Sequence, residues 1–107
     1  MDLKELQKFS RQENTRLQKY YKLSTPEELC FPITIKIMEE LGELCNEVLA
    51  HSGMQRKEKL QNFNKEDIEE EFADVILTTF NLAQSMGIDV EPGLSRKMKK
   101  IEKRYAP

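Results

Sequence analysis

Apolar residues recur at helical spacing along most of the chain, and no segment shows the strict alternation that predicts a half-buried strand. In the first segment the residues at this spacing are Leu3, Leu6, Phe9, Glu13 and Leu17. The later segments repeat the pattern with Ile, Leu and Val. We predict four helices, over about 2–22, 33–51, 64–86 and 90–105.

Residues that favour helix starts and ends lie between these segments. Pro26 predicts a short turn of helix, and Pro32 predicts a break or a new start. Asn64 is a good N-cap for the third helix, which Gly87 is expected to close. Asp89 can cap the fourth helix. Residues 52–63 are expected to form a polar connection.

Long helices joined by short loops predict an all-α fold, an antiparallel helical bundle. A length of 107 residues argues for a single domain over 1–107. Only 38% of the residues belong to the hydrophobic set, whereas 34% are charged, and this is a lean apolar fraction for a monomer. We therefore expect homo-oligomerisation to complete the bundle by sharing the core between copies.

The charge balance and the cysteines limit the partners and the compartment. A net charge of -2 gives no general attraction to nucleic acid or to an anionic membrane. No apolar run reaches the roughly 20 residues that a membrane span needs, and the first residues lack a signal-peptide core. Cys30 and Cys45 form no disulfide framework, so we expect both to be reduced and packed. These features predict a cytoplasmic protein.

Acidic residues border the apolar face of the second helix. On a wheel of about 100° per residue, Glu40, Glu43 and Glu47 fall within roughly 60° at the edge of the apolar arc. Glu39 lies just outside this group. Acids on a solvated helix usually lie opposite the core, so acids at the edge of the apolar face favour a functional role for these carboxylates.

The third helix carries a second pair of acids. Asp74 is embedded in the apolar run "FADVIL", and Glu71 lies one turn earlier on the same side. Carboxylates from two neighbouring helices would repel one another, and Mg²⁺, which prefers oxygen ligands, would relieve that repulsion. Salt bridges to Lys36, Lys97 or Arg104 are the alternative. A di-iron site is disfavoured, because the only histidine has no acid three residues before it.

The two acidic motifs also resemble a known family. "EELGE" (39–43) and "EEFAD" (70–74) are similar to the EExxE and ExxD motifs of MazG-like, all-α nucleotide pyrophosphohydrolases. The stretch "GIDVEPGLSRKMKKIEKRY" (87–105) resembles the tail of that family, in which GID leads to a K…R stretch. The resemblance covers about 33–105, which is most of the chain.

The resemblance implies an enzyme that hydrolyses nucleoside triphosphates between the α and β phosphates, giving a monophosphate and pyrophosphate. It implies Mg²⁺, with Mn²⁺ as a substitute, and a homodimer or dimer of dimers. By position, Glu40, Glu43, Glu71 and Asp74 would be the metal ligands. Glu39 and Glu43 would be catalytic, and Glu39 would hold a second metal or orient the attacking water. A role in clearing unwanted nucleotides is also implied.

The resemblance further implies which residues contact the substrate. Lys97 and Arg104 stand where the family places phosphate-contacting cations, although Ile101 occupies a position that is often Asn. The other candidates for substrate binding are Lys36, Thr78 and Asn81. The aromatic residues that could stack on a base are expected to lie in the core instead: Phe9, Tyr20, Tyr21 and Phe63.

Two alternatives remain open at the level of sequence. The first is a phosphoribosyl-ATP pyrophosphohydrolase, which resembles the leading candidate in fold and metal site. The second is a catalytically silent helical interaction module whose acids are salt-bridge partners on the surface. An interaction module of this kind predicts that Mg²⁺ does not change the melting temperature, whereas a metal-dependent enzyme predicts that it does.

Overall fold

The computed structural model describes residues 1–53 and 64–107, and all regular structure in these two ranges is helical. The all-α prediction is therefore confirmed. The elements are α1 (Leu3–Tyr20), the short 3₁₀ helix η1 (Pro26–Leu29), α2 (Cys30–His51), α4 (Lys65–Ser85) and α5 (Glu91–Arg104). Phe63 and most of the expected polar connection lie outside the described residues.

Side-chain caps fix the helix starts. Asp2 Oδ1 accepts the backbone N–H of Glu5 at 2.9 Å, and Asn64 Oδ1 accepts that of Glu66 at 2.9 Å. The predicted cap at Asn64 is thus confirmed. Pro32 accompanies a new helix start, one of the two outcomes predicted for it. It lies in the first turn of α2, where the missing N–H has no helical partner to lose, so η1 leads directly into a helix that begins at Cys30.

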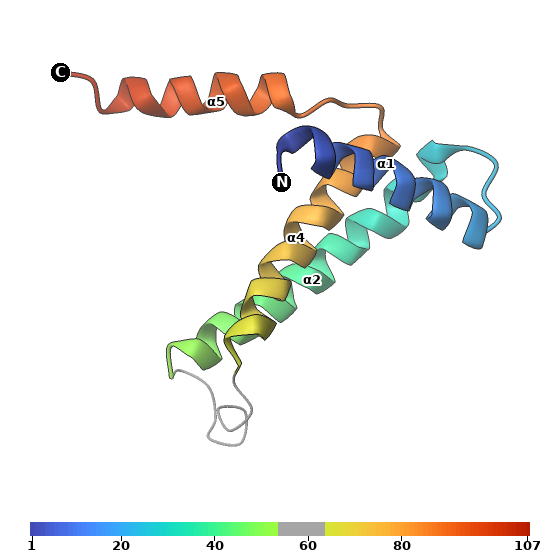
Figure 1. Ribbon diagram of the computed structural model, residues 1–107, viewed down its shortest axis with the longest axis horizontal. Coiled ribbons are helices and arrows are strands. Elements are labelled where there is room, and N and C mark those ends of the chain that lie inside the picture. Colours follow the sequence, from blue (N-terminus) through green and yellow to red (C-terminus); the bar gives the residue numbers. More distant parts are fainter. Residues whose placement is uncertain (54–63) are drawn as a thin grey trace.

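Helices α2 and α4 form an antiparallel pair, and α1 crosses one end of it (Figure 1). Gly87 ends α4 with a φ of 68°, a left-handed conformation that glycine adopts without strain. Asp89 then accepts a hydrogen bond from the Gln7 side chain at 2.9 Å and another from the N–H of Glu91 at 3.0 Å. The start of α5 is therefore tied to α1.

The core is thin. Among the described residues the buried apolar side chains are Leu29, Ile33 and Ala83. The radius of gyration is 16.9 Å, whereas a compact chain of this length has about 13 Å. Cys45 is exposed, so the expectation that both cysteines are packed is wrong for it. None of the helices in the described ranges is long and apolar enough to span a membrane.

Helix α5 does not join the bundle. It leaves the top of α4 and extends away from the other helices (Figure 1), and every residue from Glu91 to Pro107 is exposed. Within one chain the bundle therefore consists of α1, α2 and α4, and the expected completion by homo-oligomerisation stays a prediction. Within residues 1–53 and 64–107, no other element covers the apolar side of α5.

Candidate metal and nucleotide site

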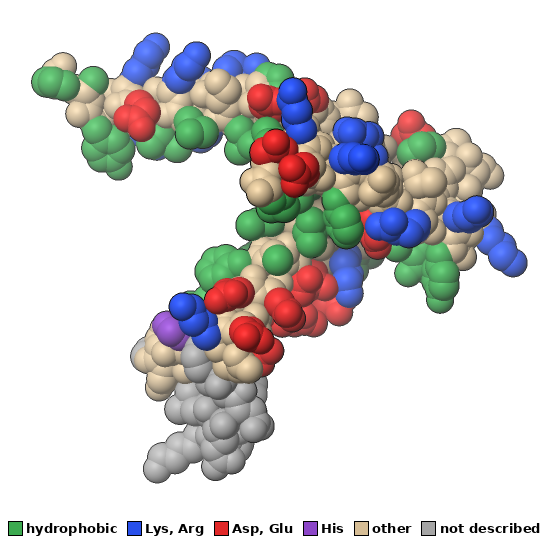
Figure 2. Space-filling model, in the orientation of Figure 1, with side chains coloured by type: hydrophobic (Ala, Val, Ile, Leu, Met, Phe, Trp, Pro, Cys, Tyr) green, Lys and Arg blue, Asp and Glu red, His purple; other side chains and the backbone are tan. Residues whose placement is uncertain are grey.

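Three of the predicted metal ligands come together where α2 and α4 pack. One carboxylate oxygen from each of Glu40, Glu43 and Glu71 lies within 4.8 Å of the others. Residues 40 and 43 are one turn apart on α2, and residue 71 faces them from α4. In Figure 2 acidic side chains gather over this part of the two helices. The sequence pattern thus identified a real cluster of carboxylates.

Two oxygens of this cluster have no partner within the described chain. Oε2 of Glu40 and Oε2 of Glu71 are buried, and neither accepts a hydrogen bond there. Glu40 is only 7% exposed. Burying an ionised oxygen without a partner is costly, so both atoms fit a ligand that supplies positive charge. Carboxylate oxygens suit hard cations such as Mg²⁺ and Mn²⁺.

Mutual repulsion contributes to raised pKa values of two members of the cluster, Glu43 and Glu71. The nearby charge of Glu40 raises the pKa of Glu43 above its ordinary value, and Glu39 adds to this effect. For Glu71, desolvation is the main cause of a raised pKa, followed by the charge of Glu43. Both groups are therefore easier to protonate than ordinary glutamates, as is expected of acids that lie close to one another.

Lys36 supplies part of that counter-charge. Its Nζ lies 3.2 Å from Oε1 of Glu40 and 3.4 Å from Oε1 of Glu39. The hydrogen bond to Glu40 is the largest cause of a raised pKa for the Lys36 ammonium. One of the salt bridges considered as an alternative, the one to Lys36, is therefore present. It involves Oε1 of Glu40, whereas the unpartnered oxygen is Oε2.

Asp74 occupies a different position from the one expected. It is exposed, not embedded in apolar surroundings, and it is not one of the three residues whose oxygens come within 4.8 Å. Nevertheless its charge contributes to the raised pKa values of Glu43 and Glu71. Asp74 and Glu40 also line the same cavity, so Asp74 lies at the border of the cluster.

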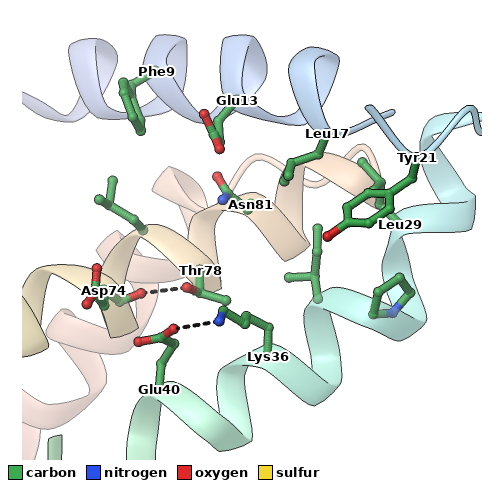
Figure 3. Close-up of a pocket in the computed structure, with 13 residues that line it drawn as sticks. Phe9, Glu13, Leu17, Tyr21, Leu29, Lys36, Glu40, Asp74, Thr78 and Asn81 are labelled. Atoms are coloured by element: carbon green, nitrogen blue, oxygen red, sulfur yellow. Dashed lines mark hydrogen bonds and ion pairs between the residues drawn. The ribbon is translucent and has the colours of Figure 1, made fainter. Parts of the chain in front are cut away.

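That cavity lies between α1 and the α2–α4 pair and has a volume of about 370 Å³, within the usual range for small-molecule sites. Figure 3 shows Glu40, Asp74 and Lys36 at one end, with α1 side chains closing the other. Phe9 and Tyr21 line it and are 42% and 57% exposed, so the expectation that they lie in the core is wrong. Tyr20 is exposed as well.

Polar side chains hold α1 over this cavity. Ser10 Oγ donates to Oδ1 of Asn81 at 2.7 Å, and Asn14 Nδ2 donates to the backbone oxygen of Asn81 at 2.7 Å. Thr78, the other predicted pocket residue on α4, donates its hydroxyl to the backbone oxygen of Asp74 at 2.6 Å. Both Thr78 and Asn81 line the cavity, as expected, although these polar groups already have partners in the protein.

The sequence interpretation missed Glu13. This residue lines the cavity from α1 and pairs with Arg16 at 2.9 Å through Oε2. Its signal was its position among the apolar residues of the first helix. Lys97 and Arg104, by contrast, were predicted as site residues but do not lie near the site in this chain. They are exposed on α5, and the structure does not bring them to the carboxylates of their own chain.

Comparison with known families gives a match over most of the chain. The model of a family described as the MazG-like family matches residues 33–106, which include both acidic segments and α5. No curated protein and no solved structure matches the chain.

Proposed function

The chain belongs to the MazG-like family, and from this premise we propose that it is a nucleoside triphosphate pyrophosphohydrolase that depends on a divalent cation. The reaction would cleave a nucleoside triphosphate between the α and β phosphates to a monophosphate and pyrophosphate. One observation carries the proposal: carboxylate oxygens of Glu40, Glu43 and Glu71 lie within 4.8 Å of one another, and two buried oxygens of this cluster have no hydrogen-bond partner in the part of the chain that the structure describes.

The proposed ligands of the cation, Mg²⁺ or Mn²⁺, are Glu40, Glu43, Glu71 and Asp74. When bound, the ion would neutralise polyphosphate charge and lower the pKa of a coordinated water. Glu40 and Glu71 fit the role best because each has a buried unpartnered oxygen. Asp74 contributes from the rim that the cluster shares with the cavity.

Glu43 and Glu39 are the proposed catalytic carboxylates. Glu43 is exposed, so water reaches it, and its pKa is raised by Glu40 and Glu39. A carboxylate with a raised pKa is a stronger base and suits the task of orienting or deprotonating an attacking water. Glu39 lies beside it, paired with Lys36 at 3.4 Å. No side-chain nucleophile is needed for this chemistry.

The charges along the cavity indicate how a nucleotide would lie. Phosphates belong at the end that holds Lys36 and the cation, because the carboxylates alone would repel them. The nucleoside then extends toward α1, where Phe9 and Tyr21 offer aromatic faces and Thr78 and Asn81 line the wall. In this chain Lys97 and Arg104 are remote, so in the proposal they reach phosphate only from another copy of a homo-oligomer.

Pyrophosphate release from a panel of nucleoside triphosphates, with and without Mg²⁺, tests the proposal. We expect release only with the cation, and its loss in Glu43→Gln and Asp74→Asn with the helical circular dichroism unchanged. Glu66→Gln, an exposed acid in the first turn of α4, is the matched control and should retain activity. No release from any nucleotide would contradict the proposal, and turnover of phosphoribosyl-ATP alone would shift the substrate assignment.

A further inference from the structure

Helix α5 is amphipathic, yet its apolar face is exposed in the structure. Its apolar residues lie on one face at helical spacing: Leu94, Met98, Ile101 and Tyr105, which are 45%, 65%, 40% and 83% exposed. In Figure 2 basic and apolar side chains occupy different sides of this helix. A helix of 14 residues is marginal on its own in water, so its formation depends on a surface that the apolar face can bury.

Helix α2 carries a second uncovered apolar face. Taken at about 100° per residue, the exposed residues of this face fall within roughly 80° and lie opposite Ile33 and Glu40, which face the protein. We call this face the α2 stripe, and it consists of Phe31, Ile35, Met38, Gly42, Cys45 and Leu49. Phe31, Ile35 and Met38 are 82%, 63% and 71% exposed.

Gly42 lies in the middle of the α2 stripe, and no neighbouring atom of the described chain requires a glycine at this position. A Cβ atom added there would meet nothing within 4 Å. Glycine in a helix interior is less stable than alanine, so open space around it is a cost with no local benefit. Close approach of another helix is the usual benefit, since glycine lets two backbones come together.

We propose that α5 of one copy of this chain packs along the α2 stripe of a second copy, with Gly42 at the point of closest approach. A second copy is the partner that fits, because one chain carries both uncovered faces and a two-fold pair would cover both at once. The proposal does not depend on the reaction catalysed.

The charges that border the two faces are complementary. Lys97 and Arg104 flank the apolar face of α5 on one side, whereas Glu39 and Glu43 flank the α2 stripe on one side. Helical geometry brings these two edges together only when α5 and the partner's α2 run parallel. In the antiparallel orientation the acids of α2 would instead meet Glu102 of α5.

Disulfide trapping tests the contact directly, because Cys45 is a native, exposed and free thiol within the α2 stripe. In a Cys30→Ser background, cysteine is introduced singly as Leu94→Cys, Met98→Cys or Ile101→Cys. We expect at least one variant to form a disulfide-linked dimer under mild oxidation that disappears when Cys45→Ser is added. Lys103→Cys, on the opposite face of α5, is the control. No linked dimer, or an equal yield from the control, would overturn the proposal.

Sedimentation of Gly42 variants provides an independent measurement. Gly42→Ala and Gly42→Leu favour the helix of the isolated chain, yet we expect them to raise the dimer dissociation constant in that order, by at least tenfold for leucine. A monomeric wild-type chain, or dissociation constants unchanged by both substitutions, would contradict the proposal. Circular dichroism shows whether each variant retains its helices.

Discussion

The ammonium of Lys36 lies 3.2 Å from Oε1 of Glu40, one helical turn further along α2. The other oxygen of the same carboxylate is buried and accepts no hydrogen bond from the described residues. Glu40 is therefore shared between a lysine and the position where a cation is proposed to bind. Lys36 partly neutralises the cluster and so competes with that cation.

Lys36→Met should separate these two effects. The lysine side chain is 52% exposed, so its loss should lower stability without a divalent cation by no more than about 1 kcal/mol. Affinity for Mg²⁺ should rise by up to roughly fivefold, because the competing charge is gone. Calorimetric titration with Mg²⁺ measures the affinity, and Lys19→Met on α1 is the control. Weaker binding of Mg²⁺ by the variant would contradict the competition.

Glu71→Gln should stabilise the protein when no divalent cation is present. The substitution removes one of three crowded charges, and relief of about 0.5 kcal/mol would raise the melting temperature by about 2–4 °C. It should also abolish the increase in melting temperature that Mg²⁺ gives the wild type. Thermal scans with Mg²⁺ or EDTA provide the measurement. Glu69→Gln, an exposed neighbour on α4, should retain the response to Mg²⁺.

The raised pKa values of Glu43 and Glu71 predict a pH dependence of stability. Between the ordinary glutamate pKa of 4.5 and the raised values, the folded chain binds more protons than the unfolded chain. Their contribution is therefore fully present below pH 4.5 and is lost as the pH rises through the folded pKa values.

Chemical denaturation at several pH values, in EDTA, measures this dependence. The wild type should lose stability relative to a Glu43→Gln, Glu71→Gln double variant as the pH rises through that window. Mg²⁺ should reverse the trend, because it binds the deprotonated carboxylates. Parallel stability curves for the two proteins would show that the pKa shifts are absent.

Ser10→Ala should destabilise the attachment of α1. The Ser10 side chain is fully buried and donates to Asn81 at 2.7 Å, so its removal leaves a part-buried acceptor unpaired, at a cost of about 1–3 kcal/mol. Urea denaturation gives the change in free energy. Thr15→Ala removes an exposed hydroxyl that bonds its own helix at 3.0 Å, and it should change stability by less than about 0.5 kcal/mol. Equal effects of the two substitutions would contradict the anchoring role of Ser10.

The helices and the carboxylate cluster could be predicted because each depends on local spacing. Asn64 and Gly87 mark helix ends through their own backbone chemistry. Residues 40 and 43 share a helix face whatever the fold, and the apolar side of α4 determines that Glu71 meets them. Pro32 marks the start of α2 because proline is tolerated in the first turn of a helix but not in its interior, although the predicted start at residue 33 was three residues late.

The cavity could not be predicted because it depends on how α1 crosses the other helices. An apolar run around Asp74 suggested burial, yet the exposure of one residue is decided by which neighbouring helix covers it, and none covers Asp74. Phe9 and Tyr21 are aromatic residues of the kind usually found in a core, but they line the cavity instead. The helix over α5 was predicted correctly. Its amphipathic pattern, however, does not tell whether the surface that its apolar face packs against belongs to the same chain or to another.

The thin core has a consequence for calorimetry. A globular protein of 107 residues unfolds with a heat-capacity increment of about 1.3–1.6 kcal/mol/K, most of which comes from apolar surface newly exposed to water. In the lone chain many described apolar side chains are already exposed, among them Phe31, Met38 and Tyr105, so less such surface is left to expose on unfolding. Its increment should fall well below that range, and its stability curve should be correspondingly flat with temperature.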